Sequence, residues 1–488
     1  MKKKLFVTTL IIFFINGCVL FKPDEQSLIP DGTPDAFSLY SNGEKQESLF
    51  WWKDFKNPEL DRLIETALGS NFDLREAYAR LKQAQAFSKI SASEMLPQVS
   101  ASAGFDHKKT DSSSSGGAST SNTFSLGLAA SYELDLWGRV RSQKEADRLY
   151  MTESRELYQS AAMTVAAEIT EAWIDIIATR KEIAFVKETI KANESLLGAM
   201  LLRFEKSHAT ALDVLQQKQA LASARSALPL LEAKERILMN NMILLTGKTG
   251  ASENRVESDL LPSLPPVPAP GLPAELISMR PDIRAAGLHL KAADWEVSAA
   301  RAARLPSLSL SASGTYSAAD VDDIFRNWIA NLAASLTGPV FDAGRRKSVV
   351  KRARAIAEER LATYEKTVFS AIRDVENALV NEDKQSAYLS AIGNERMAAE
   401  LSLKESTRRY LAGQVSFLTM QERFLRVQAL NGQEIRQKAA VLKYRIALYR
   451  ALGGNWNWKE SEKKKENEKA ISLPMPVVGK IEEKGIRY

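Results

Sequence analysis

The chain has 488 residues, of which 26% are charged and 45% hydrophobic, and its formal net charge is +6. These ordinary fractions argue against a disordered chain, and the length favours two to four globular domains. Lys2, Lys3 and Lys4 supply half of the net charge, and the rest of the chain has no dense stripe of Lys and Arg. We therefore expect no nucleic-acid partner.

The N-terminus has the pattern of a secretory signal. Three lysines precede an apolar run, residues 5–15, which is too short to span a bilayer as a helix. The following Asn16-Gly17-Cys18 resembles a bacterial lipobox, in which the cysteine is acylated and becomes the mature N-terminus. We expect a signal peptide at 1–17, a lipid on Cys18 and a linker at 18–50; an ordinary signal peptide with an incidental cysteine is the alternative. Val19 in place of Asp favours the outer membrane as the destination.

The sequence also repeats itself. Several markers recur in the same order about 206 to 210 residues apart, a period too long for a solenoid and typical of a duplication. A proline-rich segment, 261–272, separates a first half, 51–260, from a second half, 273–458, and a charged tail, 459–488, follows. The paired markers are Leu96-Pro97-Gln98-Val99 with Leu305-Pro306-Ser307-Leu308, Asp135-Leu136-Trp137-Gly138-Arg139 with Phe341-Asp342-Ala343-Gly344-Arg345, and Arg203-Phe204 with Arg409-Tyr410.

Each half contains two segments in which apolar and polar residues alternate. They are expected at about 97–107, 122–135, 305–316 and 327–337, long enough for tilted strands that cross a bilayer. One face of each strand is apolar. The other is polar and includes Glu133 and Asp135, which we predict to line a water-filled pore. The Ser- and Gly-rich segment 108–122 is expected to be a flexible external loop.

Four strands cannot close a membrane barrel, and open sheet edges are not tolerated in lipid. The barrel is therefore expected to be shared between chains. The strand count alone allows a dimer or a trimer, and three chains would supply twelve strands.

The remaining sequence is helical in character. Two proline-free runs, about 139–205 and 345–411, would each form a helix of about 100 Å that packs as a coiled coil. Return helices are expected at 211–246 and 417–452, and shorter helices at 72–94 and 281–303 before the strands. No run of 18 apolar residues follows the signal segment, so no transmembrane helix is expected.

These motifs resemble those of the TolC-like outer-membrane efflux proteins, especially the lipoprotein branch typified by NodT and OprM. The resemblance covers about residues 51–456 and implies a mainly helical fold: a homotrimer with a twelve-stranded membrane β-barrel continued by a long coiled-coil α-helical barrel. It also implies a periplasmic adaptor protein and an inner-membrane pump, of the resistance-nodulation-division type, as partners, and outer-membrane lipid as the surroundings. The residues that carry it are Asn57-Pro58-Glu59-Leu60, Asp135-Leu136-Trp137-Gly138-Arg139, Arg280-Pro281-Asp282-Ile283-Arg284, Gly338-Pro339-Val340-Phe341-Asp342-Ala343-Gly344-Arg345-Arg346 and Arg409-Tyr410-Leu411-Ala412-Gly413.

The resemblance assigns roles to individual residues. Leu418 and Glu422 fall on the family's periplasmic gate, one helical turn apart, although plain coiled-coil positions are the alternative. Adaptor contacts are expected at Arg409, Tyr410 and Gly413. The first tip, near His208, lacks a matching glycine and is expected to contribute less. Gly138 and Gly344 are expected to be structural turns between strand and helix.

Enzyme functions lack the necessary residues. His107, His208 and His289 are widely separated, and Cys18 is assigned to the lipid. Gly247-Lys248-Thr249 lacks the first glycine of a phosphate-binding loop and is interpreted as a helix end. We therefore expect no catalysis, no metal and no cofactor. Two other functions stay open: the outer-membrane duct of a type I protein secretion system, and a periplasmic coiled-coil scaffold that does not conduct.

Overall fold

The computed structural model describes residues 21–23, 28–39, 50–112, 117–248, 256–268, 271 and 273–454. The predicted signal peptide, Cys18 and the tail 459–488 lie outside these residues. The chain forms two compact units. The first comprises Met1–Leu28, Arg80–Arg155 and Ala285–Lys366, and the second comprises Ile29–Ala79, Glu156–Arg284 and Thr367–Tyr488.

The two halves have the same order of elements, except that the 3-10 helix η3 lies between the two strands of the second half. In the first half the elements are η1 (Trp51–Phe55), α2 (Pro58–Ser70), α3 (Phe72–Ser93), β1 (Gln98–Ser112), β2 (Gly117–Leu134), α4 (Arg139–Glu205) and α5 (Ala211–Thr246). In the second half they are η2 (Pro273–Glu275), α6 (Leu276–Met279), α7 (Pro281–Ala302), β3 (Ser307–Ala318), η3 (Val321–Asp323), β4 (Trp328–Thr337), α8 (Arg345–Leu411) and α9 (Phe417–Ala451). Helices α4 and α8 each have 67 residues. A mainly helical chain with one antiparallel sheet confirms the predicted fold class.

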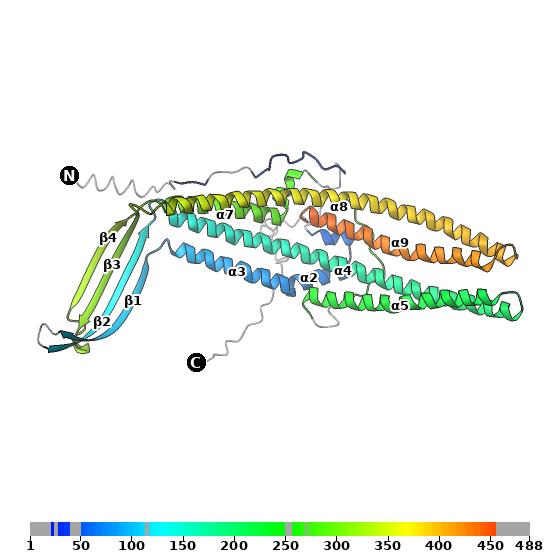
Figure 1. The fold of residues 1–488 in the computed structure, drawn as a ribbon, viewed down its shortest axis with the longest axis horizontal. Coiled ribbons are helices and arrows are strands. Elements are labelled where there is room, and N and C mark those ends of the chain that lie inside the picture. Colours follow the sequence, from blue (N-terminus) through cyan, green and yellow to red (C-terminus); the bar gives the residue numbers. More distant parts are fainter. Residues whose placement is uncertain are drawn as a thin grey trace. The chain divides into compact units, whose positions relative to one another are not determined.

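The strands form one sheet in the order β1-β2-β3-β4, and every neighbouring pair is antiparallel (Figure 1). Strands β1 and β4 are the two edges of this sheet. All four strands belong to the first unit.

The described residues of the segment 108–122, which are 108–112 and 117–122, form strands and not the loop that we expected. Strand β1 continues to Ser112 and pairs with β2 through Lys108–Ser121, Thr110–Ser119 and Ser112–Gly117. The sequence of this segment consists almost entirely of polar and small residues, so it lacks the alternation of apolar and polar residues by which a strand is recognised. The antiparallel ladder nevertheless continues, because pairing of the backbone does not require an apolar face.

The core of the second unit explains the motif Asn57-Pro58-Glu59. The Asn57 side chain accepts hydrogen bonds from the backbone N–H of Glu59 (2.9 Å) and Leu60 (3.2 Å), and Pro58 occupies the first turn of α2. Glu59 accepts from Trp173 Nε1 at 2.9 Å and from the backbone N–H of Ser258 at 3.0 Å. This carboxylate therefore joins α2 to the long helix α4 and to the segment that leads into the proline-rich linker.

In the first unit, α7 packs against α4. Ala146 and Leu149 of α4 form a small buried cluster with Ala292 of α7. Tyr150 donates a hydrogen bond to Glu296 at 3.0 Å, and His289 Nδ1 lies 2.7 Å from Glu153. His289 is thus a structural partner of a carboxylate between two helices.

Candidate functional site

The sheet has one continuous apolar face. The register places the predicted apolar residues of all four strands opposite one another, and the Phe105 and Phe124 rings lie 4.7 Å apart. This face is not covered within the chain, since Leu128 is 62% exposed and Leu332 is 86% exposed. The cross-strand neighbours on it are Val99–Ala130, Ala101–Leu128, Leu126–Tyr316, Tyr132–Leu310, Leu308–Leu336, Ala312–Leu332 and Tyr316–Trp328.

The opposite face is lined mainly by small polar side chains. Ser100, Ser102, Ser125, Ser131, Ser309, Ser311, Ser313 and Asn331 lie on it. A sheet with one apolar and one polar face suits a boundary between lipid and water. Among the described residues, no helix is both long enough and apolar enough to cross a membrane.

Glu133 and Asp135 accept hydrogen bonds from the first residues of α4, at the point where β2 leads into this helix. Glu133 accepts two hydrogen bonds from Arg139, at 3.1 and 2.9 Å. Asp135 accepts from the backbone N–H of Val140 (3.0 Å) and Arg141 (2.8 Å), so it caps the start of α4. Their pore-lining role stays a prediction, but the structure assigns both carboxylates a role in the turn from strand to helix.

The turn after β4 follows the same plan. Asp342 accepts from the backbone N–H of Gly344 (3.0 Å) and Arg346 (3.1 Å) at the start of α8. Gly138 and Gly344 have φ of +80° and +84°, a left-handed backbone that glycine adopts without steric cost. This geometry supports the structural role expected for the two glycines.

The two helical tips of the second unit pack on each other. Beside the turn between α4 and α5 and the turn between α8 and α9, the helices share a small apolar core, which contains Met200, Val214, Phe417 and Met420. The Arg203 guanidinium of the first tip lies 4.9 Å from the centre of the Tyr410 ring of the second. Tyr410 also packs on Phe417, with ring centres 5.8 Å apart. Tyr410, expected to contact an adaptor, is therefore half-buried between the tips.

The backbone of the first tip matches that of the second despite the missing glycine. Ser207 has φ of +62° and occupies the place that Gly413, with φ of +73°, occupies in the second tip. The closing hydrogen bonds are equivalent: His208 N–H donates to Arg203 O at 2.8 Å, and Gln414 N–H donates to Arg409 O at 2.9 Å. The missing glycine therefore does not change the backbone of the first tip, because serine adopts the left-handed conformation at a modest steric cost. The smaller contribution of this tip to adaptor contact stays a prediction.

The predicted gate residues lie on an open face of α9. Leu418 is 44% exposed and Glu422 is also exposed, whereas Met420 and Gln421 are buried. Gln421 donates to Gln217 Oε1 of α5 at 3.2 Å, and Gln217 in turn donates to Asn193 Oδ1 of α4 at 2.9 Å. These buried amides were not predicted from the sequence, in which glutamine and asparagine on a helix are typical of solvated positions. They join the two hairpins directly beside the predicted gate.

Arg409 is held by an ion pair. Glu405 accepts hydrogen bonds from Arg408 (2.9 and 2.8 Å) and from Arg409 (2.8 Å). These bonds, first from Arg408 and then from Arg409, lower the pKa of Glu405 to about 2. The carboxylate is therefore ionised throughout the neutral pH range.

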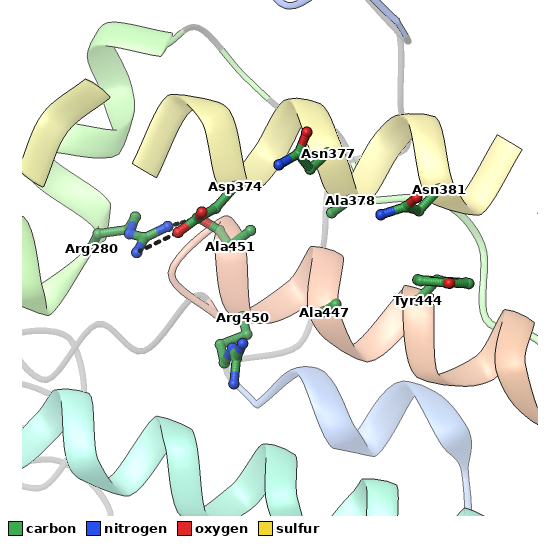
Figure 2. Close-up of a pocket in the computed structure, with 9 residues that line it drawn as sticks. All are labelled: Arg280, Asp374, Asn377, Ala378, Asn381, Tyr444, Ala447, Arg450 and Ala451. Carbon is green, nitrogen blue, oxygen red and sulfur yellow. Dashed lines mark hydrogen bonds and ion pairs between the residues drawn. The ribbon is translucent and has the colours of Figure 1, made fainter. Parts of the chain in front are cut away.

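A polar pocket of about 260 Å³ lies between α8 and α9 (Figure 2). Arg280, from the motif Arg280-Pro281-Asp282, reaches this pocket and is nearly buried. Its guanidinium pairs with Asp282 at 2.7 Å, lies 3.8 Å from Asp374 and donates to Ala451 O at 3.0 Å. Because Arg280 is satisfied by these groups, the pocket is explained by the attachment of the segment Arg280–Asp282 to the middle of α8 and to the C-terminal end of α9.

His107 and Gly247 lie in structural surroundings in the described part of the chain. His107 Nδ1 lies 2.7 Å from Asn122 Oδ1, and no group of three metal-ligating side chains is found among the described residues. Gly247 has a left-handed backbone and ends α5, which confirms its interpretation as a helix end.

Comparison with known proteins agrees with these features. A family model described as outer membrane efflux protein matches residues 63–248 and 272–454. The chain is 34% identical over 413 residues to the pyoverdine export outer membrane protein OpmQ of Pseudomonas aeruginosa, covering 83% of this chain and 87% of that protein. It is 27% identical over 457 residues to the probable outer membrane lipoprotein SilC of Salmonella typhimurium, covering 91% and 97%.

Solved structures have the same fold. The outer-membrane channel OprN is 26% identical with a TM-score of 0.81, and the match covers 90% of this chain and all of that one. The open state of the Neisseria gonorrhoeae MtrE outer membrane channel is similar in fold, with a TM-score of 0.77 over 90% of this chain and 99% of that one.

Proposed function

Because this chain belongs to the outer membrane efflux protein family, we propose that it is the outer-membrane channel of a tripartite efflux system that exports small toxic compounds. The observation that carries this proposal is the four-stranded sheet, which has one apolar face, one polar face and two open edges. A channel is not an enzyme and supplies no energy of its own. The energy for export would come from the pump.

Closure of the sheet requires further copies of the chain. The outer edges of β1 and β4 carry backbone N–H and C=O groups that need partners, because water does not reach the hydrocarbon core. If β4 of one copy pairs with β1 of the next, a homotrimer closes a twelve-stranded barrel. The apolar face then contacts lipid and the polar face lines the pore, near Glu133 and Asp135.

The start of the described chain supports a lipid anchor. Phe21, three residues after Cys18, lies under the Arg301 guanidinium at 6.0 Å, close to the end of α7 and the start of β3. An acyl chain on Cys18 would thus enter the membrane beside the strands. The relative SilC is itself named as a lipoprotein.

Substrate and partners are proposed from the family. Relatives are named for the export of pyoverdine and for toluene efflux, which suits a duct for small molecules. A periplasmic adaptor would dock beside Arg409, Tyr410 and Gly413 and connect the duct to a pump of the resistance-nodulation-division type. Leu418 and Glu422 would form an apolar ring and an acidic ring that close the tip at rest.

Planar-bilayer recording tests the proposal. The purified wild-type protein should give discrete conductance steps, and Glu422→Ala should raise the open fraction because it removes the acidic ring. Glu188→Ala, an exposed carboxylate of α4 far along the chain from the tip, is the matched control and should behave like wild type. Silence of both the wild type and Glu422→Ala would contradict a conducting channel and favour a scaffold.

The stoichiometry is tested separately. Mass photometry of the protein in detergent should give one species with the mass of three chains plus lipid. A dimer would overturn the twelve-stranded closure.

A further inference from the structure

The start of α8 carries a strongly basic patch that the proposed function does not use. Six cations occur between residues 345 and 354, and the segment 338–357 contains a single acid, Asp342, which caps α8. Arg346 donates to Ala303 O. The other five cations of this patch are exposed: Arg345, Lys347, Lys351, Arg352 and Arg354. Among the described residues, no carboxylate forms an ion pair with any of these five side chains.

Three of these cations lie on one face of the helix. Lys347, Lys351 and Arg354 are spaced i, i+4 and i+7, so their side chains lie above one another along α8. Like charges at this spacing repel one another, and the arrangement costs free energy unless an anion lies against it. The next residue of the stripe is Glu358, which begins the mixed charges of the rest of the helix.

The first half shows what the same positions look like when the cations are paired. Arg139 pairs with Glu133 and Arg141 with Asp135, and Arg148 pairs with Glu145 at 2.6 Å. Counted from the starts of α4 and α8, Lys351 occupies the position of Glu145, and Arg352 that of the buried Ala146. The second half therefore has a cation, Lys351, where the first half has the carboxylate of Glu145 that pairs with Arg148.

Exposed apolar side chains lie directly before the basic patch. Val340 and Phe341, in the turn from β4 into α8, are 103% and 87% exposed. Apolar and aromatic side chains next to cations are typical of protein segments at the membrane surface, where the apolar groups enter the acyl boundary and the cations contact phosphates. The apolar face of β4, with Leu332 and Leu336, is continuous with this turn.

We propose that Lys347, Lys351 and Arg354, together with Val340 and Phe341, bind anionic phospholipid headgroups at the periplasmic face of the outer membrane. This inference rests on the proposed function, which places the apolar face of the sheet in that membrane. The cations contact the phosphates of phospholipids such as phosphatidylglycerol, and the two apolar side chains insert beside the acyl chains.

A second copy of the chain suits this patch less well than a lipid. Closure of the sheet would bring the segment before β1 of the neighbouring copy toward the start of α8. Residues 80–97 of that segment carry three cations, Arg80, Lys82 and Lys89, against one acid, Glu94. This segment has a net positive charge by sequence and offers the patch a single carboxylate, Glu94.

Lipid titration of the full-length protein in neutral detergent tests the inference. Phosphatidylglycerol should raise the unfolding temperature in a saturable manner, and phosphatidylcholine or inorganic phosphate at the same concentrations should not. The triple variant Lys347→Gln/Lys351→Gln/Arg354→Gln should bind phosphatidylglycerol on the order of 100-fold more weakly, from about fivefold per charge, and 1 M salt should weaken binding to the wild type.

The matched control removes three other exposed cations, in Lys191→Gln/Lys234→Gln/Lys404→Gln, and should keep wild-type affinity. Equal binding by both triple variants would overturn the inference, as would an equal response to inorganic phosphate. A trimer that dissociates in the first variant without any lipid effect would instead assign the patch to the contact between copies. Conductance of both variants in phosphatidylcholine bilayers reports separately on the channel function.

Discussion

The two halves of the chain form the same elements at the same spacing but stabilise them with different chemistry. Arg445 and Glu382 of the second half form a buried ion pair between α9 and α8, with Nε–Oε2 at 2.9 Å, and Arg445 also donates to Pro265 O in the linker. The corresponding residues of the first half, Met239 and Ile176, belong to an apolar core. The same helix length and register are therefore compatible with a buried ion pair or with apolar packing at this position. The ion pair also attaches the linker, through the bond from Arg445 to Pro265 O.

The largest expected effect comes from breaking this ion pair. Arg445→Met leaves Glu382 buried without its partner and should lower the free energy of unfolding by about 3–5 kcal/mol. Thermal and denaturant unfolding of the purified protein would measure the loss.

The double variant Arg445→Met/Glu382→Ile copies the first half and should recover most of that stability. If the double variant is no more stable than the single one, the two halves are not interchangeable at this contact. The bond to the linker at Pro265 would then be the main contribution of Arg445.

The helix caps after the two strand pairs should contribute differently to the free energy of unfolding, by a smaller amount than the ion pair. Asp135 binds two backbone N–H groups and also the Arg141 side chain, whereas Asp342 binds two backbone N–H groups. Asp135→Ala should cost about 2 kcal/mol and Asp342→Ala about 1 kcal/mol, since loss of a cap typically costs about 0.5–2 kcal/mol. Unfolding of both variants under one set of conditions measures the difference. Equal losses would show that the Arg141 pair adds nothing.

Substitutions at the equivalent positions of the two tips should have opposite effects on the free energy of unfolding. Gly413→Ala forces a side chain into a left-handed backbone and should cost about 1 kcal/mol, although no atom lies within 4 Å of the added Cβ. Ser207→Gly should stabilise the first tip by about 0.5 kcal/mol, because relief of strain is partly offset by greater freedom of the unfolded chain. Hydrogen exchange of the tip amides reports both changes, and a loss of protection in Ser207→Gly would contradict the comparison.

The smallest effect is expected from pH at the second tip. The pKa of Glu405 is lowered to about 2, so the stability that its ion pairs supply is present above its usual pKa and is lost only as the pH falls toward 2. Tip protection in hydrogen exchange, corrected for intrinsic rates, should thus be the same at pH 5.5 and pH 7.5 in the wild type and in Glu405→Gln. A wild-type change in that range that Glu405→Gln abolishes would refute this assignment.

Periodicity predicted the fold well where it was strong. The apolar residues assigned to one face of each strand do lie on one face, and the two long helices occupy the proline-free runs that begin after Gly138 and Gly344. The predicted strands 97–107 and 122–135 were shorter than the observed β1 and β2. The sequence between them consists almost entirely of polar and small residues and therefore shows no apolar alternation. Asp135 stands just before a helix start, so its sequence position could have indicated a cap.

Contacts between distant residues could not be predicted in this way. The Gln217–Gln421 hydrogen bond and the Arg203–Tyr410 stack join the two tips, whose sequences are about 200 residues apart. Glutamine and arginine on a long helix are most simply interpreted as solvated, and only the packing of the hairpins makes them buried partners. Gate and adaptor assignments came from family resemblance, and they stay predictions.

The two open sheet edges have a genetic consequence. We assume that every pore needs three chains to close its wall. A subunit with a mutated β1 or β4 edge would then still pair with wild-type subunits through its other edge, and the resulting barrel could not close. With equal expression of sound and damaged alleles and random mixing, roughly one pore in eight would contain sound subunits only. Edge mutations should therefore be dominant in a cell that carries both alleles, while a deletion of the gene should be recessive.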